Sequence, residues 1–92
     1  MNILKIASRK FLRAKAHSLK PVVITGQAGI SEAVLNEIDL ALTHHELIKV
    51  RVNALDRDKR QTMIEHICEA LDAELIQRVG HIATLYRVSP DK

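Results

Sequence analysis

Several residue types are scarce in this 92-residue chain, and each scarcity excludes a class of protein. A single cysteine cannot close an internal disulfide, and structural zinc sites usually need several cysteines. Phe and Tyr occur once each and Trp is absent, so few rings are available to stack on nucleobases. No apolar run approaches the ~20 residues that span a membrane. The N-terminus also lacks the apolar segment of a secretory signal, and we therefore expect a cytoplasmic protein.

Acidic residues are missing from the first 30 positions, although the whole chain has 11 of them. The basic side chains in this segment are Lys5, Arg9, Lys10, Arg13, Lys15 and Lys20. Positions 31–92 carry eight basic and 11 acidic side chains, a net charge of −3. A solvated helix with incidental lysines is the ordinary explanation of a charged run, but the uniform sign favours a polyanionic partner.

Composition and periodicity predict one globular domain over residues 1–92, of the α/β class. Helical spacing of apolar residues is found at about 7–18, at 31–44 and in a segment that begins at Asp56 or Asp58, whereas strands are predicted at 22–25, 48–52, 74–79 and 82–88. The order is α-β-α-β-α-β-β. Helical connections make the first three strands parallel, as neighbours or near neighbours, and the short Gly80-His81 link makes the last two an antiparallel hairpin.

The first predicted helix has two stripes at about 100° per residue. Apolar residues that we expect to face the core are Phe11, Leu12, Ala16 and Leu19. Basic residues that we expect to be exposed are Arg9, Arg13, His17 and Lys20, with Lys10 beside them. Because these cations are predicted to be solvated, their replacement is expected to change stability little.

A glycine loop, Gly26-Gln27-Ala28-Gly29, joins the first strand to the second helix, for which Ser31 is the expected N-cap. Two glycines three apart allow positive φ and close approach of a ligand, and the helix N-terminus offers unpaired N–H groups to an anion. An ordinary strand-to-helix turn is the alternative. The loop is neither a P-loop nor a dinucleotide fingerprint, because the residues that those motifs require do not follow.

Alternation in the second strand places Lys49 and Arg51 on the face opposite Ile48, Val50 and Val52. Together with the basic helix and the glycine loop, this pair is expected to form one continuous positive surface. Phosphate contacts of this kind give salt-dependent affinity with little base specificity. Recognition of the shape and backbone of structured RNA is therefore favoured over sequence reading of single strands.

No catalytic or metal-ligating set emerges from the sequence. The five histidines have no ligand-spaced partners, and Cys68 lies on the apolar stripe of the third helix. Asp56 and Asp58 are better explained as helix caps than as acids or bases. We expect a protein that is not an enzyme and that has no metal, no cofactor and no small-molecule substrate.

The motifs of this chain resemble those of the CRM domain family, the chloroplast RNA splicing and ribosome maturation module, especially its free-standing bacterial single-domain form. The matching segments are Pro21-Val22-Val23, the glycine loop, His44-His45-Glu46-Leu47-Ile48-Lys49-Val50, Gln77-Arg78-Val79-Gly80 and Leu85-Tyr86-Arg87. They occur in the family's order and cover about residues 9–90. The resemblance implies a two-layer fold with helices on a four-stranded mixed sheet, similar to the C-terminal domain of translation initiation factor three.

The resemblance also implies RNA binding through the glycine loop and its basic neighbours, and association with precursors of the large ribosomal subunit. The RNA-binding residues expected are Gly26, Gln27, Ala28, Gly29, Arg9, Lys10, Arg13, Lys20, Lys49 and Arg51. The leading hypothesis is thus a protein that binds ribosomal RNA and does not act at a membrane. One alternative is a module that docks on a ribosomal or other acidic protein, and another is a phosphate-handling enzyme, for which the sequence offers no catalytic groups.

Overall fold

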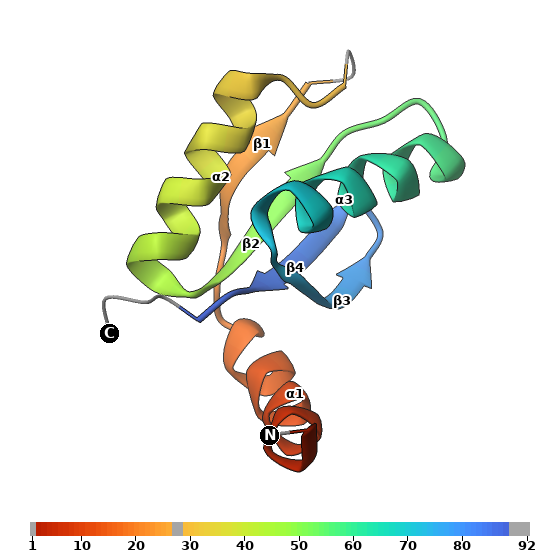
Figure 1. The fold of residues 1–92 in the computed structure, drawn as a ribbon. Helices are drawn as coiled ribbons and strands as arrows, with labels where there is room; N and C mark the ends of the chain where they lie inside the picture. The colour runs from red at the N-terminus through yellow and green to blue at the C-terminus, as the bar shows by residue number, and fades with distance from the viewer. Residues whose placement is uncertain (1, 27–28, 89–92) are drawn as a thin grey trace.

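The computed structural model describes residues 2–26 and 29–88, with side chains from Arg9 onward. Its elements follow the predicted order (Figure 1). They are α1 (Asn2–Ala16), β1 (Pro21–Thr25), α2 (Glu32–His45), β2 (Leu47–Val52), α3 (Arg57–Leu71), β3 (Glu74–Val79) and β4 (Ile82–Tyr86). The predicted α/β class and the four-stranded mixed sheet are confirmed. Of the helices in the described ranges, none is long and apolar enough to cross a bilayer.

The strands are arranged in the order β1-β2-β4-β3. Strand β1 is parallel to β2, whereas β4 is antiparallel to both β2 and β3. Strands β2 and β3 therefore run in the same direction with the hairpin strand β4 between them, so the predicted parallel relation is that of near neighbours. The Gly80-His81 link closes the hairpin, and Gly80 has the positive φ of 58° that such a tight turn requires.

Helices α2 and α3 cover one face of the sheet and enclose the main core. Both connect parallel strands that step in the same direction across the sheet, and right-handed crossovers place both helices on the same side. The side chains of Ile48, Val50 and Val52 point into this core and are buried. Helix α2 begins at its predicted cap, and α3 begins at Asp56, one of its two candidate caps. The Ser31 side chain accepts a hydrogen bond from the Val34 N–H, and the Asp56 side chain accepts one from the Lys59 N–H.

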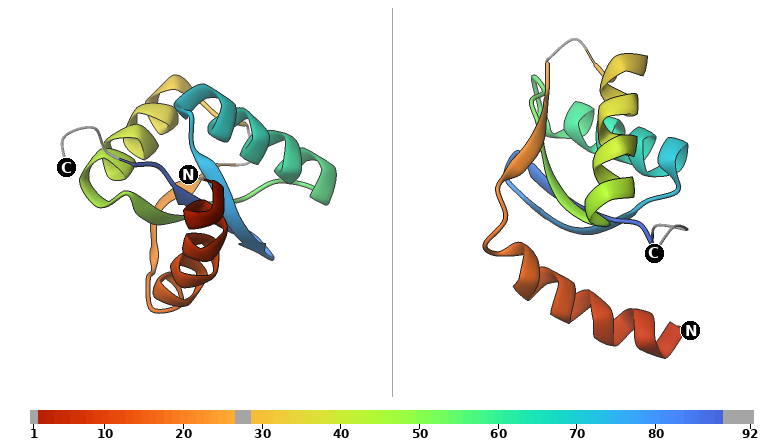
Figure 2. Two further views of the ribbon diagram at one scale, coloured as in Figure 1. Left: turned by 60° about the horizontal axis from the view of Figure 1, so that its bottom comes forward. Right: turned by 90° about the vertical axis from the view of Figure 1, so that its left-hand side faces the viewer.

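Helix α1 lies against the other face of the sheet, at one end of it (Figure 2). A small second cluster holds it there, in which Ala16 and Leu12 pack with Leu47, Ile76 and Tyr86. The expectation that Phe11 faces the core is wrong, because its side chain is 64% exposed. Phe11 and Leu12 differ by about 100° around the helix axis, so only one of them can face the sheet. The Lys15 ammonium lies 6.0 Å from the centre of the Phe11 ring instead.

Helix α3 ends at Asp72, which has left-handed backbone angles of φ 53° and ψ 44°. A residue with a Cβ is strained in this region, whereas glycine is not. We expect Asp72→Gly to raise the free energy of unfolding by about 0.5–1 kcal/mol. Urea denaturation of the variant and the wild type measures this difference. A decrease would show that the Asp72 side chain supplies an interaction larger than the backbone strain.

Candidate functional site

The sheet face that carries α1 is left uncovered beyond the end of that helix, and we call this uncovered part the open face. The strand registers arrange its side chains in two rows. The first row holds Lys49, Thr84 and Gln77, and the second holds Ile24, Arg51, Ile82 and Val79. Ile24 is 63% exposed and Val79 is 64% exposed, so the face combines cations with accessible apolar side chains.

Lys49 and Arg51 lie side by side on β2, about 7 Å apart along the strand. Lys49 is partly exposed and Arg51 is exposed. The Arg51 Nε donates to Asn53 Oδ1 at 3.3 Å, and the Asn53 amide donates to the Thr25 carbonyl at 3.2 Å. These two hydrogen bonds hold Arg51 next to the end of β1, where the glycine loop begins. The predicted position of this basic pair, on the face opposite Ile48, Val50 and Val52, is confirmed.

The exposed cations of α1 divide between two flanks of the helix. Arg13 and His17 are four residues apart and therefore share one flank, and His17 lines a groove at the border of the open face. Lys10 is exposed one turn before Arg13. Lys20 lies elsewhere, in a separate groove of about 330 Å³ that it lines with Lys15. Arg13 therefore borders the open face, whereas Lys20 faces the β1 side of the molecule.

Arg9 is not a free cation. Its Nη1 donates to the Leu75 carbonyl at 2.9 Å, and its Nη2 lies 3.4 Å from Glu74 Oε2, so the side chain ties α1 to β3. Its side chain is 42% exposed rather than fully solvated. The expectation that replacing Arg9 leaves stability unchanged is therefore corrected, because the replacement removes two contacts between α1 and the sheet. Lys10 and Arg13 are the better positions at which to test the charge of this helix.

Gly26 directly follows β1, at the opposite end of that strand from α1 (Figure 1). The five residues of β1 separate Gly26 from the end of α1 by about 17 Å. Lys49 and Arg51 on the neighbouring strand lie between them. Gln27 and Ala28 lie outside the described residues. Gly29 has φ 115°, which favours glycine, and a Cβ added at Gly26 would have no neighbouring atom within 4 Å. Glu32 in the first turn of α2 offsets part of the positive potential at that helix N-terminus.

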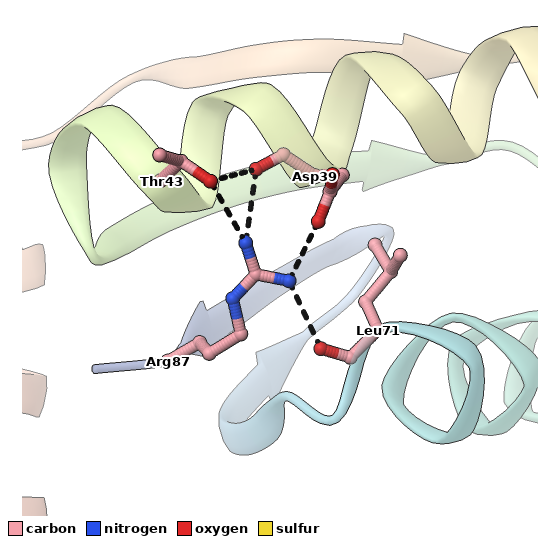
Figure 3. Close-up of polar contacts among 4 residues, drawn as sticks. All are labelled: Asp39, Thr43, Leu71 and Arg87. Atoms are coloured by element: carbon pink, nitrogen blue, oxygen red, sulfur yellow. Dashed lines mark hydrogen bonds and ion pairs between the residues drawn. The ribbon is translucent and has the colours of Figure 1, made fainter. Parts of the chain in front are cut away.

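Arg87 is a cation whose contacts were not predicted from the sequence, and it has a structural role (Figure 3). One of its Nη atoms donates to Asp39 Oδ1 at 2.7 Å and to the Leu71 carbonyl at 3.0 Å. The other donates to the Asp39 carbonyl and to Thr43 Oγ1, both at 3.1 Å. The side chain is only 17% exposed. Arg87 therefore joins the end of β4 to α2 and α3, and it lies outside the open face.

Cys68 is not an activated nucleophile. Burial raises the pKa of the Cys68 thiol, and the nearby Glu65 carboxylate raises it further, so the thiol stays protonated at neutral pH. Cys68 packs against the main core, as predicted. Within the part of the chain that the structure describes, no three His, Cys, Asp or Glu side chains come close enough to hold a metal ion.

Comparison with known proteins gives one family and several relatives. The model of the CRS1/YhbY (CRM) domain matches residues 4–87. A Haemophilus influenzae protein named RNA-binding protein is 45% identical over 91 residues, which cover 99% of this chain and 92% of the relative. A Pseudomonas aeruginosa protein that is named a probable RNA-binding protein is 38% identical, with 89% of this chain and 79% of the relative covered. The solution structure of a Staphylococcus aureus protein, described as a candidate RNA-binding protein, superposes with a TM-score of 0.76 at 36% identity and covers 88% of this chain and 84% of that one.

Proposed function

The chain belongs to the CRS1/YhbY (CRM) domain family, and on that premise we propose that it is a cytoplasmic RNA-binding protein without enzymatic activity. We propose further that its RNA is ribosomal RNA in precursors of the large subunit. The relatives described above carry RNA binding in their names. The association of the family with large-subunit precursors, which the sequence resemblance implies, supports the choice of ribosomal RNA.

One observation carries the proposal most directly: the two rows of the open face contain Lys49 and Arg51 and, among the described residues, no acidic side chain. Lys49 and Arg51 project from β2, and Arg13 borders the same face from α1. Glu74 lies at the end of the sheet that α1 covers, and Arg9 lies against its carboxylate. Such a surface attracts the phosphate backbone of a nucleic acid.

The proposed contacts are of two kinds, which are electrostatic attraction by cations and close approach of the RNA backbone to the main chain. Arg13, Lys49 and Arg51 supply most of the attraction, with Lys10 and Lys20 adding longer-range positive potential. Gly26 and Gly29 supply two positions without a side chain before the α2 N-terminus, where a phosphate can approach the main chain. Affinity should therefore fall steeply with salt concentration and depend weakly on base sequence.

Gly26→Ala tests the loop without disturbing the fold. A Cβ at this position has no neighbour within 4 Å in the protein, and the φ of Gly26 is not in the left-handed region, so we expect stability to be unchanged. If the RNA backbone packs against the loop, the methyl group should weaken binding by about fivefold. Fluorescence anisotropy with a labelled ribosomal RNA fragment measures the change. Unaltered affinity would remove the loop from the interface.

The identity of the RNA is tested by crosslinking the protein to RNA in cells and sequencing the attached fragments. The proposal predicts enrichment of large-subunit ribosomal RNA, including sequences that are present only in its precursors. Enrichment of messenger RNA over ribosomal RNA would overturn the ribosomal part of the proposal and leave RNA binding in place.

The alternative function, docking on a ribosomal or other acidic protein, makes an opposite prediction in one experiment. Capture of partners from a lysate with and without ribonuclease separates the two functions. Our proposal predicts that ribosomal components are lost after ribonuclease treatment. Retention of one protein partner after the treatment would favour the docking function.

A further inference from the structure

The groove at the border of the open face has the composition of a small binding site. It has a volume of about 370 Å³ and lies between the end of α1 and strands β2, β4 and β3. Its lining residues are His17, Lys49, Gln77, Val79, Ile82 and Thr84. This volume lies within the range of sites that bury small ligands, and the lining combines apolar, polar and basic groups.

The Gln77 amide is the polar group of this groove that is available to a ligand. Gln77 lies on β3 at the register position of Thr84, is partly exposed, and its side chain forms no hydrogen bond with the described residues. Thr84 is only 1% exposed and forms part of the groove wall. Among the described residues, the buried side-chain polar atom without a partner is Arg60 Nε, which does not line the groove. Gln77 therefore offers its amide hydrogen-bonding groups to whatever occupies the groove.

The remaining lining residues suit a ligand that has a flat ring with polar edges and an attached phosphate. Val79 and Ile82 provide an apolar surface, and the His17 imidazole can stack on a flat ring. Lys49 lies at the groove and Arg51 in the adjacent row, so an attached phosphate would find a cation. Of the residues that line the groove, none is acidic. This charge and polarity suit a nucleotide better than the apolar side chain of a protein partner.

We infer that the groove holds one unstacked nucleobase of the bound RNA, with its backbone phosphate at Lys49. This inference rests on the proposed function and adds a base contact to a surface that otherwise binds backbone. The Gln77 amide offers an acceptor and donors side by side, which matches the adjacent donor and acceptor on the edge of uracil or adenine. Bases in loops of structured RNA are free to leave the stack and enter such a site.

Three RNA hairpins with one common stem test the inference by anisotropy: one with a uridine loop, one with an adenosine loop and one whose loop is abasic. We expect the wild type to bind both base-containing loops about threefold to tenfold more tightly than the abasic loop. Gln77→Ala should remove this difference and leave affinity for the abasic hairpin unchanged. The matched control is Gln61→Ala on α3, which should change none of the three affinities.

Equal affinity of the wild type for all three hairpins would overturn the base site while leaving backbone binding established. A Gln77→Ala effect of the same size on the abasic hairpin would also overturn it, because the residue would then act through the fold or the backbone. Failure of the wild type to bind any of the hairpins would contradict the proposed function itself. The three results are distinct, so failure of the base site is not confused with failure of RNA binding.

Discussion

Replacing Lys49 and Arg51 together with Glu should weaken RNA binding by about 30-fold at moderate salt, because two phosphate contacts are lost and repulsion replaces them. The slope of log affinity against log salt concentration should become shallower by about 1.4–1.8, the value for two released phosphate contacts. Both side chains point away from the main core, so circular dichroism and thermal unfolding should show a folded protein. Anisotropy titrations over a series of salt concentrations measure both quantities.

The matched control reverses two exposed cations on the other side of the molecule. Arg57 and Lys59 lie in the first turn of α3, which covers the opposite face of the sheet. Their replacement with Glu changes the net charge by the same amount, and acidic residues are tolerated at a helix N-terminus. If this control weakens binding as much as the β2 pair does, net charge alone determines affinity and the open face has no special role.

Arg87→Ala is expected to have the largest effect on stability, a loss of about 2–4 kcal/mol in the free energy of unfolding. The substitution removes four hydrogen bonds and leaves the Leu71 carbonyl, at the end of α3, without its charged donor. For a domain of this size the melting temperature should fall by more than about 10 °C. Urea and thermal denaturation provide the measurement.

Two further variants show whether the geometry of Arg87 or only its charge is needed. Arg87→Lys keeps the charge but cannot form the planar fork that reaches Asp39, Thr43 and Leu71 together, so most of the loss should remain. Arg78→Ala, at an exposed position on β3, should change stability by less than about 0.5 kcal/mol. RNA affinity of folded Arg87→Ala should equal that of the wild type. Weakened RNA binding by a stable Arg87→Ala protein would contradict the structural role.

Local patterns in the sequence were sufficient to predict the strands, the Ser31 cap, the two candidates for the α3 cap and the face of β2 that carries its cations. Period-2 alternation identifies which side of β2 carries Lys49 and Arg51 without any knowledge of the partner strands. Ser31 and Asp56 satisfy backbone N–H groups three residues further on, which is also a local interaction. These features depend on residues close together in the chain, and the structure confirms them.

The placement of α1 could not be predicted because it depends on tertiary contacts. Handedness fixes the side on which α2 and α3 lie, since each connects two parallel strands, but α1 precedes the first strand and has no such constraint. The apolar stripe of α1 therefore does not determine which face of the sheet the helix packs against, and it led to the wrong prediction for Phe11. The Arg9 contact with Leu75 and the Arg87 contacts with Asp39 join residues 66 and 48 positions apart, which no short-range pattern reveals.

The most direct test of the central claim is an NMR titration that follows the backbone amides of the wild-type protein as a large-subunit ribosomal RNA fragment is added. We expect the largest shifts at Lys49, Arg51, Gln77 and Gly26, with smaller ones on the Arg13 flank of α1. The amides of α3, on the opposite face, should stay nearly unchanged. Shifts concentrated on α3, with an unperturbed open face, would contradict the assignment of the open face as the RNA-binding surface.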